Sequence, residues 1–247
     1  MHNTIVRALA LVALICGISS NVSAATITFQ GIGKVGVVGI HSPVLHDLSA
    51  VYAGELLWTL NGVDSFYAYC VDVNNWERPI QTVDVKTSDA LHVLGVPDAG
   101  GKAAWLVNTY ARGIHASGTG NDAAALQVAI WEALYDSAPN LDAGNTGGRG
   151  NFYLLPGTPG AISTKANVYL SALYAPGGPQ LSTATWFDAE IPGTGQDQMI
   201  PSAVPEPTSL LLLATGLAWA GIRRRPTRPA LNPASRGCGC GCALVRR

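Results

Sequence analysis

Between its two ends, this 247-residue chain has a single cysteine, Cys70. The other four cysteines stand at position 16 and at positions 238, 240 and 242. A thiol without a disulfide partner is either an inert buried side chain or a nucleophile. A cysteine hydrolase would need a base, and His92 or His115, together with Asp72, could complete such a site. No hydrolase signature surrounds Cys70, so the sequence gives that chemistry little support.

The second residue of chemical interest is Gln127. It lies in a predicted helix on the same face as Trp131, Leu134 and Tyr135. A carboxamide on an apolar face needs a polar partner in the interior. A thiolate held against the carbon of such an amide can attack it, release ammonia and leave a thioester. Gln127 can equally be a hydrogen-bonded core residue, and Cys70 an inert buried thiol.

Cys70 is expected on the second strand of a β-hairpin. Strand-forming residues occupy 51–60 and 63–73, and Asn61-Gly62 between them favours a two-residue type I′ turn. That turn predicts a register in which Ala53 faces Cys70. A small residue opposite the thiol would leave room for another side chain to approach the sulfur.

The remaining elements predict an α+β fold. Other strands are expected at 26–30, 35–40, 81–85 and 183–191, and helices at 101–112, 123–135 and 162–174. Residues 152–155 form a short apolar stretch. Loops are expected at 41–49 and 113–120, and Asn121-Asp122 can cap the second helix. We therefore expect a β-rich barrel or sandwich with helices inserted after an early hairpin.

The N-terminus has the pattern of a secretory signal peptide. Arg7 supplies the positive charge, residues 8–18 are apolar, and Val22-Ser23-Ala24 fits the small-residue cleavage pattern. An apolar stretch of 11 residues is too short to span a membrane comfortably. We expect a signal helix within 1–24, cleavage after Ala24 and folding outside the cytoplasm.

The C-terminus carries a second targeting pattern. An uncharged apolar stretch, 208–222, lies between a proline-glutamate motif and a basic cluster. The flanking residues are Pro205, Glu206 and Pro207 before it and Arg223, Arg224 and Arg225 after it. This order is typical of a short membrane helix whose basic end stays in the cytoplasm. An ordinary tail anchor is the alternative.

These three parts resemble the PEP-CTERM sorting signal. The resemblance implies a Gram-negative bacterial protein that is anchored transiently in the inner membrane. An exosortase would then cut near the Pro-Glu-Pro motif. The protein would be released to the cell surface or to an exopolysaccharide matrix. Residues 226–247 extend beyond the usual end of such signals, and we interpret them as a disordered tail without function.

Charge and cysteine spacing exclude several other classes. Residues 25–200 hold 7 basic and 15 acidic residues, a net charge of −8, although the whole chain has a formal charge of only −1. An acidic domain argues against nucleic acid as a partner. The alternating Gly-Cys pattern near the end does not have zinc-site spacing. No cofactor and no metal site is predicted.

Two motifs resemble the bacterial thioester domain, also called the TQXA domain, of surface adhesins. Tyr69-Cys70-Val71-Asp72 matches the aromatic-cysteine motif, and Leu126-Gln127-Val128-Ala129-Ile130-Trp131 matches the glutamine motif. Leu126 stands where that family often has threonine. The resemblance implies an internal Cys70–Gln127 thioester, with Tyr69 and Trp131 as supporting residues. His115 is a candidate base for the attacking amine.

The sequence thus predicts five segments. They are a signal peptide 1–24, a thioester-like domain 25–195, a linker 196–203, a sorting signal 204–225 with a short transmembrane helix, and the tail 226–247. We expect a secreted protein that attaches covalently and once to an amine-bearing surface, and not an enzyme that turns over. The alternative is a non-reactive structural or carbohydrate-binding matrix protein. Trp58, Trp76 and Trp186 would then be candidates for stacking on sugars.

Overall fold

The computed structural model describes residues 24–141, 150–189 and 195–202. The predicted signal helix up to residue 23, the membrane helix, the sorting residues and the tail lie outside these ranges. Ala24, the predicted cleavage position, is the first residue of strand β1. In the described ranges, no helix is long and apolar enough to cross a membrane.

Six strands pair in a closed ring. They are β1 (Ala24–Ser42), β2 (His46–Leu60), β3 (Asp64–Cys70), β4 (Ile80–Thr87), β6 (Thr185–Ala189) and β7 (Gln198–Ile200). The sheet order is β2-β3-β7-β6-β4-β1, and β1 also pairs with β2, so the ring closes. The short strand β5 (Tyr153–Leu154) adds to β1 outside the ring. A closed ring leaves few free strand edges, which is the usual arrangement of a small β-barrel.

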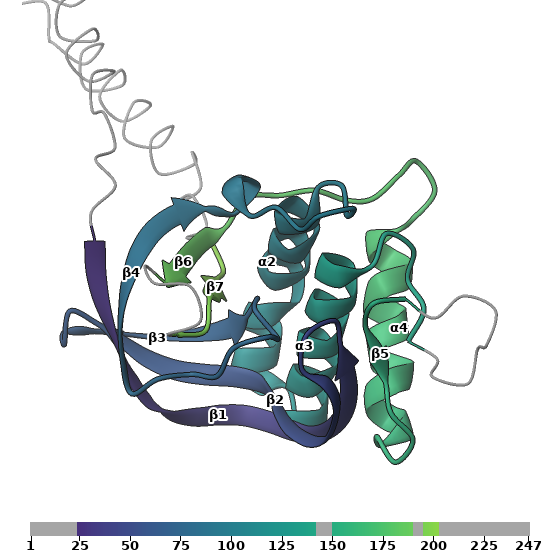
Figure 1. The fold of residues 1–247 in the computed structure, drawn as a ribbon, viewed down its shortest axis with the longest axis horizontal. Helices are drawn as coiled ribbons and strands as arrows, with labels where there is room; N and C mark the ends of the chain where they lie inside the picture. Colours follow the sequence, from purple (N-terminus) through teal and green to yellow (C-terminus); the bar gives the residue numbers. More distant parts are fainter. Residues whose placement is uncertain (1–23, 142–149, 190–194, 203–247) are drawn as a thin grey trace, which may run out of the picture. The chain divides into compact units, whose positions relative to one another are not determined.

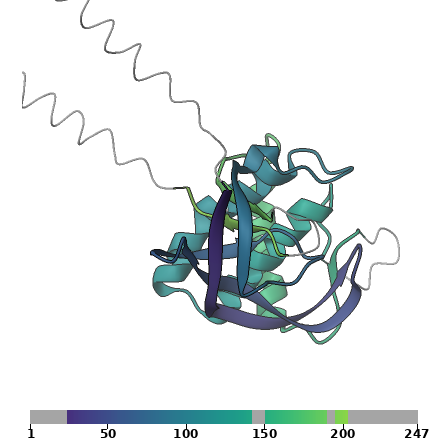
Figure 2. The same cartoon turned by 60° about the vertical axis from the view of Figure 1, so that its left-hand side comes forward.

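Strand β1 closes the ring because it serves two neighbours. Its first residues, 24–28, pair with β4, and residues 27–42 pair with β2. The strand bends along its course between these neighbours (Figure 2). Three register shifts along the β1–β2 ladder accompany this bend. The predicted strands at 26–30 and 35–40 are therefore one continuous strand, and a short turn replaces most of the loop predicted at 41–49.

Among the residues that the structure describes, three helices and a short 3₁₀ turn complete the α+β fold that the sequence predicts. The 3₁₀ turn is η1 (Ser88–Ala90), and the helices are α2 (Ala99–Ser117), α3 (Gly120–Tyr135) and α4 (Gly160–Leu173). Figure 1 shows α3 between α2 and α4. Every residue of α3 from Ala123 to Tyr135 is buried, because α3 packs against both neighbouring helices and against β1 and β2.

The start of α3 differs slightly from the prediction. Helix α2 continues to Ser117, so only a short connection remains of the loop predicted at 113–120. Thr119 is the N-cap, and its side chain accepts a hydrogen bond from the Asp122 N–H at 3.3 Å. The Asp122 carboxylate in turn accepts from the Thr119 N–H at 2.8 Å. This reciprocal capping box places the cap two residues before Asn121.

The residues of β3 divide between two cores. Phe66 and Ala68 face the barrel interior, where they contact residues such as Trp58 and Phe187. Tyr69 faces the helices, as alternation along a strand requires. Cys70, the last residue of β3, also contacts the helix-side core. The end of β3 therefore carries Cys70 out of the barrel interior toward α3.

The predicted hairpin register is wrong by one residue. The turn itself has the expected form, with positive φ at Asn61 (50°) and Gly62 (75°). However, the β2–β3 ladder starts at Leu60↔Asp64, which makes the connection three residues long. Thr26 of β1 explains the difference, because its N–H and C=O both bond to Asn61. The hairpin rule omits this third strand.

Two consequences follow from the observed pairings. Ala53 pairs with Gly36 of β1 and does not face Cys70. Near the C-terminal end of the domain, β7 lies inside the stretch 196–203 that was predicted as a linker. β7 joins β3 to β6 by pairing Tyr69 with Met199 and Phe187 with Gln198. The domain therefore extends to Ser202.

Candidate functional site

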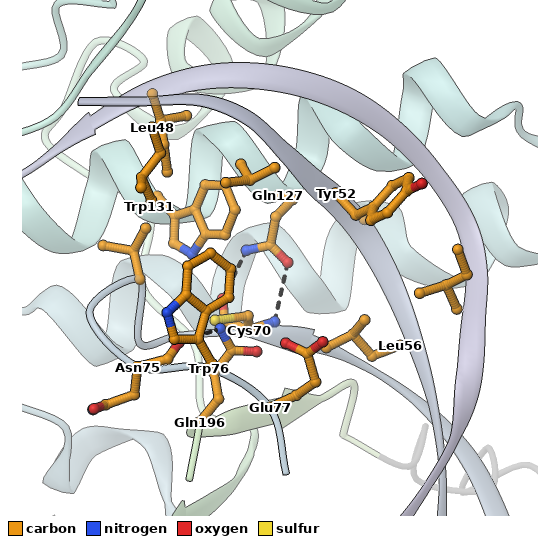
Figure 3. Close-up of a pocket in the computed structure, with 15 residues that line it drawn as sticks. Leu48, Tyr52, Leu56, Cys70, Asn75, Trp76, Glu77, Gln127, Trp131 and Gln196 are labelled. Atoms are coloured by element: carbon orange, nitrogen blue, oxygen red, sulfur yellow. Dashed lines mark hydrogen bonds between the residues drawn. The ribbon is translucent and has the colours of Figure 1, made fainter. Parts of the chain in front are cut away.

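The structure brings Cys70 and Gln127 into direct contact across 57 residues of chain. Gln127 Nε2 donates a hydrogen bond to the Cys70 carbonyl oxygen at 2.7 Å, and the Cys70 N–H donates to Gln127 Oε1 at 3.0 Å. Both residues are buried, with exposed fractions of 3% for Cys70 and 1% for Gln127. Figure 3 shows the amide of Gln127 directly above Cys70.

The strand pairing explains why Cys70 is free to bind a side-chain amide. On the β7 side, the Val71 N–H donates to the Asp197 carbonyl oxygen at 3.0 Å. Successive residues of a strand direct their backbone groups to opposite sides, so those of Cys70 point away from β7. The β2–β3 ladder ends at Leu56↔Ala68, before it reaches Cys70. On that side of Cys70, the Gln127 amide therefore makes the two hydrogen bonds that a peptide group of a neighbouring strand would make.

The departure of β2 from the ladder coincides with Gly54. Two residues before Leu56, this glycine has φ = +137°, a conformation that residues with a side chain rarely adopt. A Cβ atom there would lie 2.3 Å from the Lys34 carbonyl oxygen and 3.2 Å from the Ala123 Cβ. Gly54 thus lets β1, β2 and α3 approach one another, which brings Gln127 to Cys70.

The surroundings of the Cys70 thiol favour its protonated form. Its Sγ donates a hydrogen bond to the Asp72 carbonyl oxygen at 3.1 Å. Burial, and then the negative charge of Asp72, raise the pKa of the Cys70 thiol well above its usual value. The Trp131 indole N–H partly lowers that pKa. This buried N–H makes no hydrogen bond of normal geometry within the described chain.

A small cavity of about 90 Å³ adjoins the Cys70–Gln127 pair (Figure 3). Its wall is largely apolar, and the sulfur and the Gln127 amide lie on it. Trp76 and Tyr52 stand at the mouth, with exposed fractions of 56% and 65%. The lining residues are Ile32, Ile40, Leu48, Val51, Tyr52, Gly54, Leu56, Cys70, Val73, Asn75, Trp76, Glu77, Gln127, Trp131 and Gln196.

The other predicted site residues lie at different distances from this cavity. Tyr69 is buried beside Cys70, and its hydroxyl donates to Glu55 Oε1 at 3.5 Å. His115 Nδ1 lies 3.2 Å from Glu55 Oε2, and its ring stacks on Tyr67. His115 does not line the cavity. Tyr69 and His115 therefore both contact Glu55, which does not line the cavity.

The arrangement of a cysteine hydrolase is not assembled. Among the described residues that line the cavity there is no histidine. The Asp72 carboxylate is occupied by the Asn74 N–H, at 2.9 Å, and by the Asn75 side-chain amide. No described group of three or more histidine, cysteine, aspartate or glutamate residues is arranged to hold a metal ion.

Sequence reasoning missed several residues of the cavity. Asn75 and Glu77 follow Cys70 closely in the chain, so their short separation in sequence could have indicated that they lie near the site. Gln196 had no such signal, because it lies in the supposed linker. Of the three tryptophans considered for sugar stacking, Trp58 is buried in the barrel and Trp186 is 7% exposed. Only Trp76 stands at a cavity mouth.

Comparison with known proteins gives a match at the C-terminal end of the chain. Residues 203–225 match the family model of the PEP-CTERM protein-sorting motif. This motif marks a secreted protein that is processed at the membrane by an exosortase and becomes extracellular or attached to the cell surface. Neither a curated protein nor a solved structure matches the chain. The match lies outside the folded domain, whose function therefore has to be argued from its geometry.

Proposed function

We propose that Cys70 and Gln127 form an internal thioester, through which the secreted protein attaches covalently, and once, to an amine-bearing surface. The observation that carries the proposal is the pair of hydrogen bonds between the Gln127 amide and the Cys70 backbone. They hold the amide carbon next to the residue that carries the only cysteine sulfur in the described chain. Such fixed proximity is what an intramolecular acyl transfer requires.

Formation of the thioester is a simple exchange at the Gln127 side chain. The sulfur leaves the Asp72 carbonyl oxygen and bonds to Gln127 Cδ. The bond from Cδ to Nε2 then breaks, and ammonia departs with the former thiol proton. The Cys70 N–H already donates to Oε1, the oxygen on which negative charge develops. The unpaired indole N–H of Trp131 supplies a further buried donor beside the sulfur.

Opening by an amine reverses the exchange with a new nitrogen. The amine attacks Cδ, its surplus proton passes to the departing sulfur, and Cys70 is restored as a thiol. The new amide has the same C=O as the original glutamine and one N–H. It can therefore make the hydrogen bonds to the Cys70 backbone that Gln127 makes in the structure. If Cys70 attacked this new amide, it would release the attached partner. A stable amide product therefore favours a single attachment.

The competing function is that of a non-reactive matrix protein. A glutamine that continues a strand ladder has a structural purpose without any chemistry, and the two hydrogen bonds fit that purpose as well. Trp76, Asn75 and Gln196 at the cavity mouth also combine an aromatic face with amides, as sugar-binding sites do. The two functions differ in covalent structure, which can be measured directly.

The test is the intact mass of the secreted, processed protein. We expect wild type to be lighter than its sequence by one ammonia, and to show no free thiol after unfolding in acid. Cys70→Ala and Gln127→Ala should each have the full mass of their sequences. Gln30→Ala, which changes an exposed glutamine of β1, is the matched control and should keep the deficit. Full mass in wild type, with a thiol that titrates after unfolding, refutes the proposal.

A further inference from the structure

We propose that Trp76 and Glu77 form an acceptor subsite that selects a positively charged, unbranched amine for attack on Gln127. This inference rests on the proposed thioester. It is drawn from the loop between β3 and β4, which passes from Cys70 over the mouth of the cavity. Figure 3 shows both side chains beside Cys70, with the Glu77 carboxylate directed toward the cavity.

The loop that carries these side chains is fixed by hydrogen bonds on both sides. Gln196 Nε2 donates to the carbonyl oxygens of Asn75, at 2.9 Å, and of Asp72, at 3.2 Å. On the helix side, the Val73 N–H donates to the Tyr135 hydroxyl at 3.3 Å. The loop is therefore held between the segment that precedes β7 and the end of α3. Trp76 and Glu77 consequently have a defined position relative to Cys70.

The charge at the cavity mouth favours a cation. Glu77 is the one charged residue among those that line the cavity in the described chain, and no lysine, arginine or histidine accompanies it. Trp76 adds an exposed aromatic face, which attracts an ammonium group through its ring electrons. A carboxylate beside an indole ring is a suitable site for an alkylammonium ion, and it disfavours a carboxylate or a phosphate.

The size of the cavity favours a slender acceptor. An apolar cavity of about 150 Å³ can hold benzene, whereas this one has a volume of about 90 Å³. Ile32 and Tyr52 continue its apolar wall to the surface. An unbranched alkyl chain that ends in an amine fits these dimensions better than a sugar ring. The chain would lie along the apolar wall with its ammonium group at Glu77. The ammonium group gives up one proton to solvent at the cavity mouth before the neutral nitrogen attacks Cδ.

The experiment compares two small nucleophiles on the intact secreted protein at pH 7. Methylamine is almost entirely cationic at this pH, whereas hydroxylamine is neutral. The rate of thioester opening is followed by the gain in intact mass. Glu77→Gln should lower the methylamine rate about fivefold, as expected for one charge pair near 4 Å in water. It should leave the hydroxylamine rate unchanged, and Glu77→Asp should retain most of the methylamine rate.

Trp76 is tested in the same way. Trp76→Ala should slow methylamine more than hydroxylamine, whereas Trp76→Phe keeps an aromatic face and most of the selectivity. Glu77→Gln protein that carries the thioester, but loses both rates equally or neither, refutes the subsite and leaves the thioester standing. Wild-type protein of full mass refutes the thioester itself, and with it the subsite. The two failures are therefore distinguishable.

Discussion

Opening the proposed thioester with methylamine should reduce the stability of the domain by about 4 kcal/mol. A bond between Cys70 and Gln127 closes a loop of 57 residues. The chain-entropy relation for cross-links assigns roughly 4 kcal/mol to a loop of that length. The methylamide that replaces the bond keeps a C=O and an N–H where Gln127 has them. The two hydrogen bonds to Cys70 are therefore preserved, and the change in stability isolates the cross-link.

Urea unfolding, followed by tryptophan fluorescence, measures this change in the free energy of unfolding. Thermal unfolding gives a second measure. Each kcal/mol shifts the melting temperature of a domain of this size by about 2–4 °C, so opening the thioester should lower the melting temperature by roughly 8–16 °C. The urea m-value should also rise, because the unfolded chain is no longer constrained by the loop. Cys70→Ala, which has no thioester, is the control and should not respond to methylamine.

One result would refute this reasoning directly. If intact mass shows complete reaction with methylamine while the unfolding midpoint stays where it was, the bond does not constrain the loop between β3 and α3. Either other residues would then form the reactive pair, or the opened protein would gain stability elsewhere in the fold that offsets the loss of the cross-link.

Three further variants test the surrounding structure. Burial raises the pKa of Glu132 to about 8, so this carboxyl contributes stability below pH 4.5 that is lost as the pH rises toward 8. In urea titrations at several pH values, Glu132→Gln should remove this loss of stability, which is on the order of 4 kcal/mol. An unchanged dependence of stability on pH would contradict the assignment. Gly54→Ala should destabilise by about 2–3 kcal/mol in thermal unfolding, because of its positive φ and the contact with Lys34, whereas wild-type stability would contradict the close approach. Trp131→Phe removes the N–H that lowers the pKa of the Cys70 thiol. Thioester formation after refolding should therefore slow about tenfold or more, as for loss of one hydrogen bond to a charged group, and equal rates would contradict that contribution.

Much of the fold was predictable because its signals are local. The helical periodicity of α3 and the Asn61-Gly62 turn both appear where the sequence indicates them. The contact between Cys70 and Gln127 was also expected, but from the motif resemblance rather than from the fold. The register of the hairpin failed because Thr26, distant in sequence, binds the turn residue Asn61. A rule that considers two strands cannot include a third.

The sequence does not predict strand β7, for a related reason. Its three residues, Gln198, Met199 and Ile200, follow polar and glycine-rich sequence and have no strand signal of their own. They form a strand because β3 and β6 each offer an edge that would otherwise be unpaired. Gln196 enters the cavity lining for the same reason. Such positions depend on tertiary context, which composition and periodicity do not record.

The location of β7 has a consequence for when the site can mature. This strand completes the ring and ends at Ile200, only a few residues before the sorting motif begins at 203. Export delivers the N-terminal part of a secreted chain first, so β3 and α3 emerge before β7 does. The Gln196 bonds to the loop over the sulfur can form only after the residues next to the sorting motif have been exported. A chain that stalls during export before residue 196 is therefore expected to lack these bonds, and the site of the proposed thioester would be incomplete.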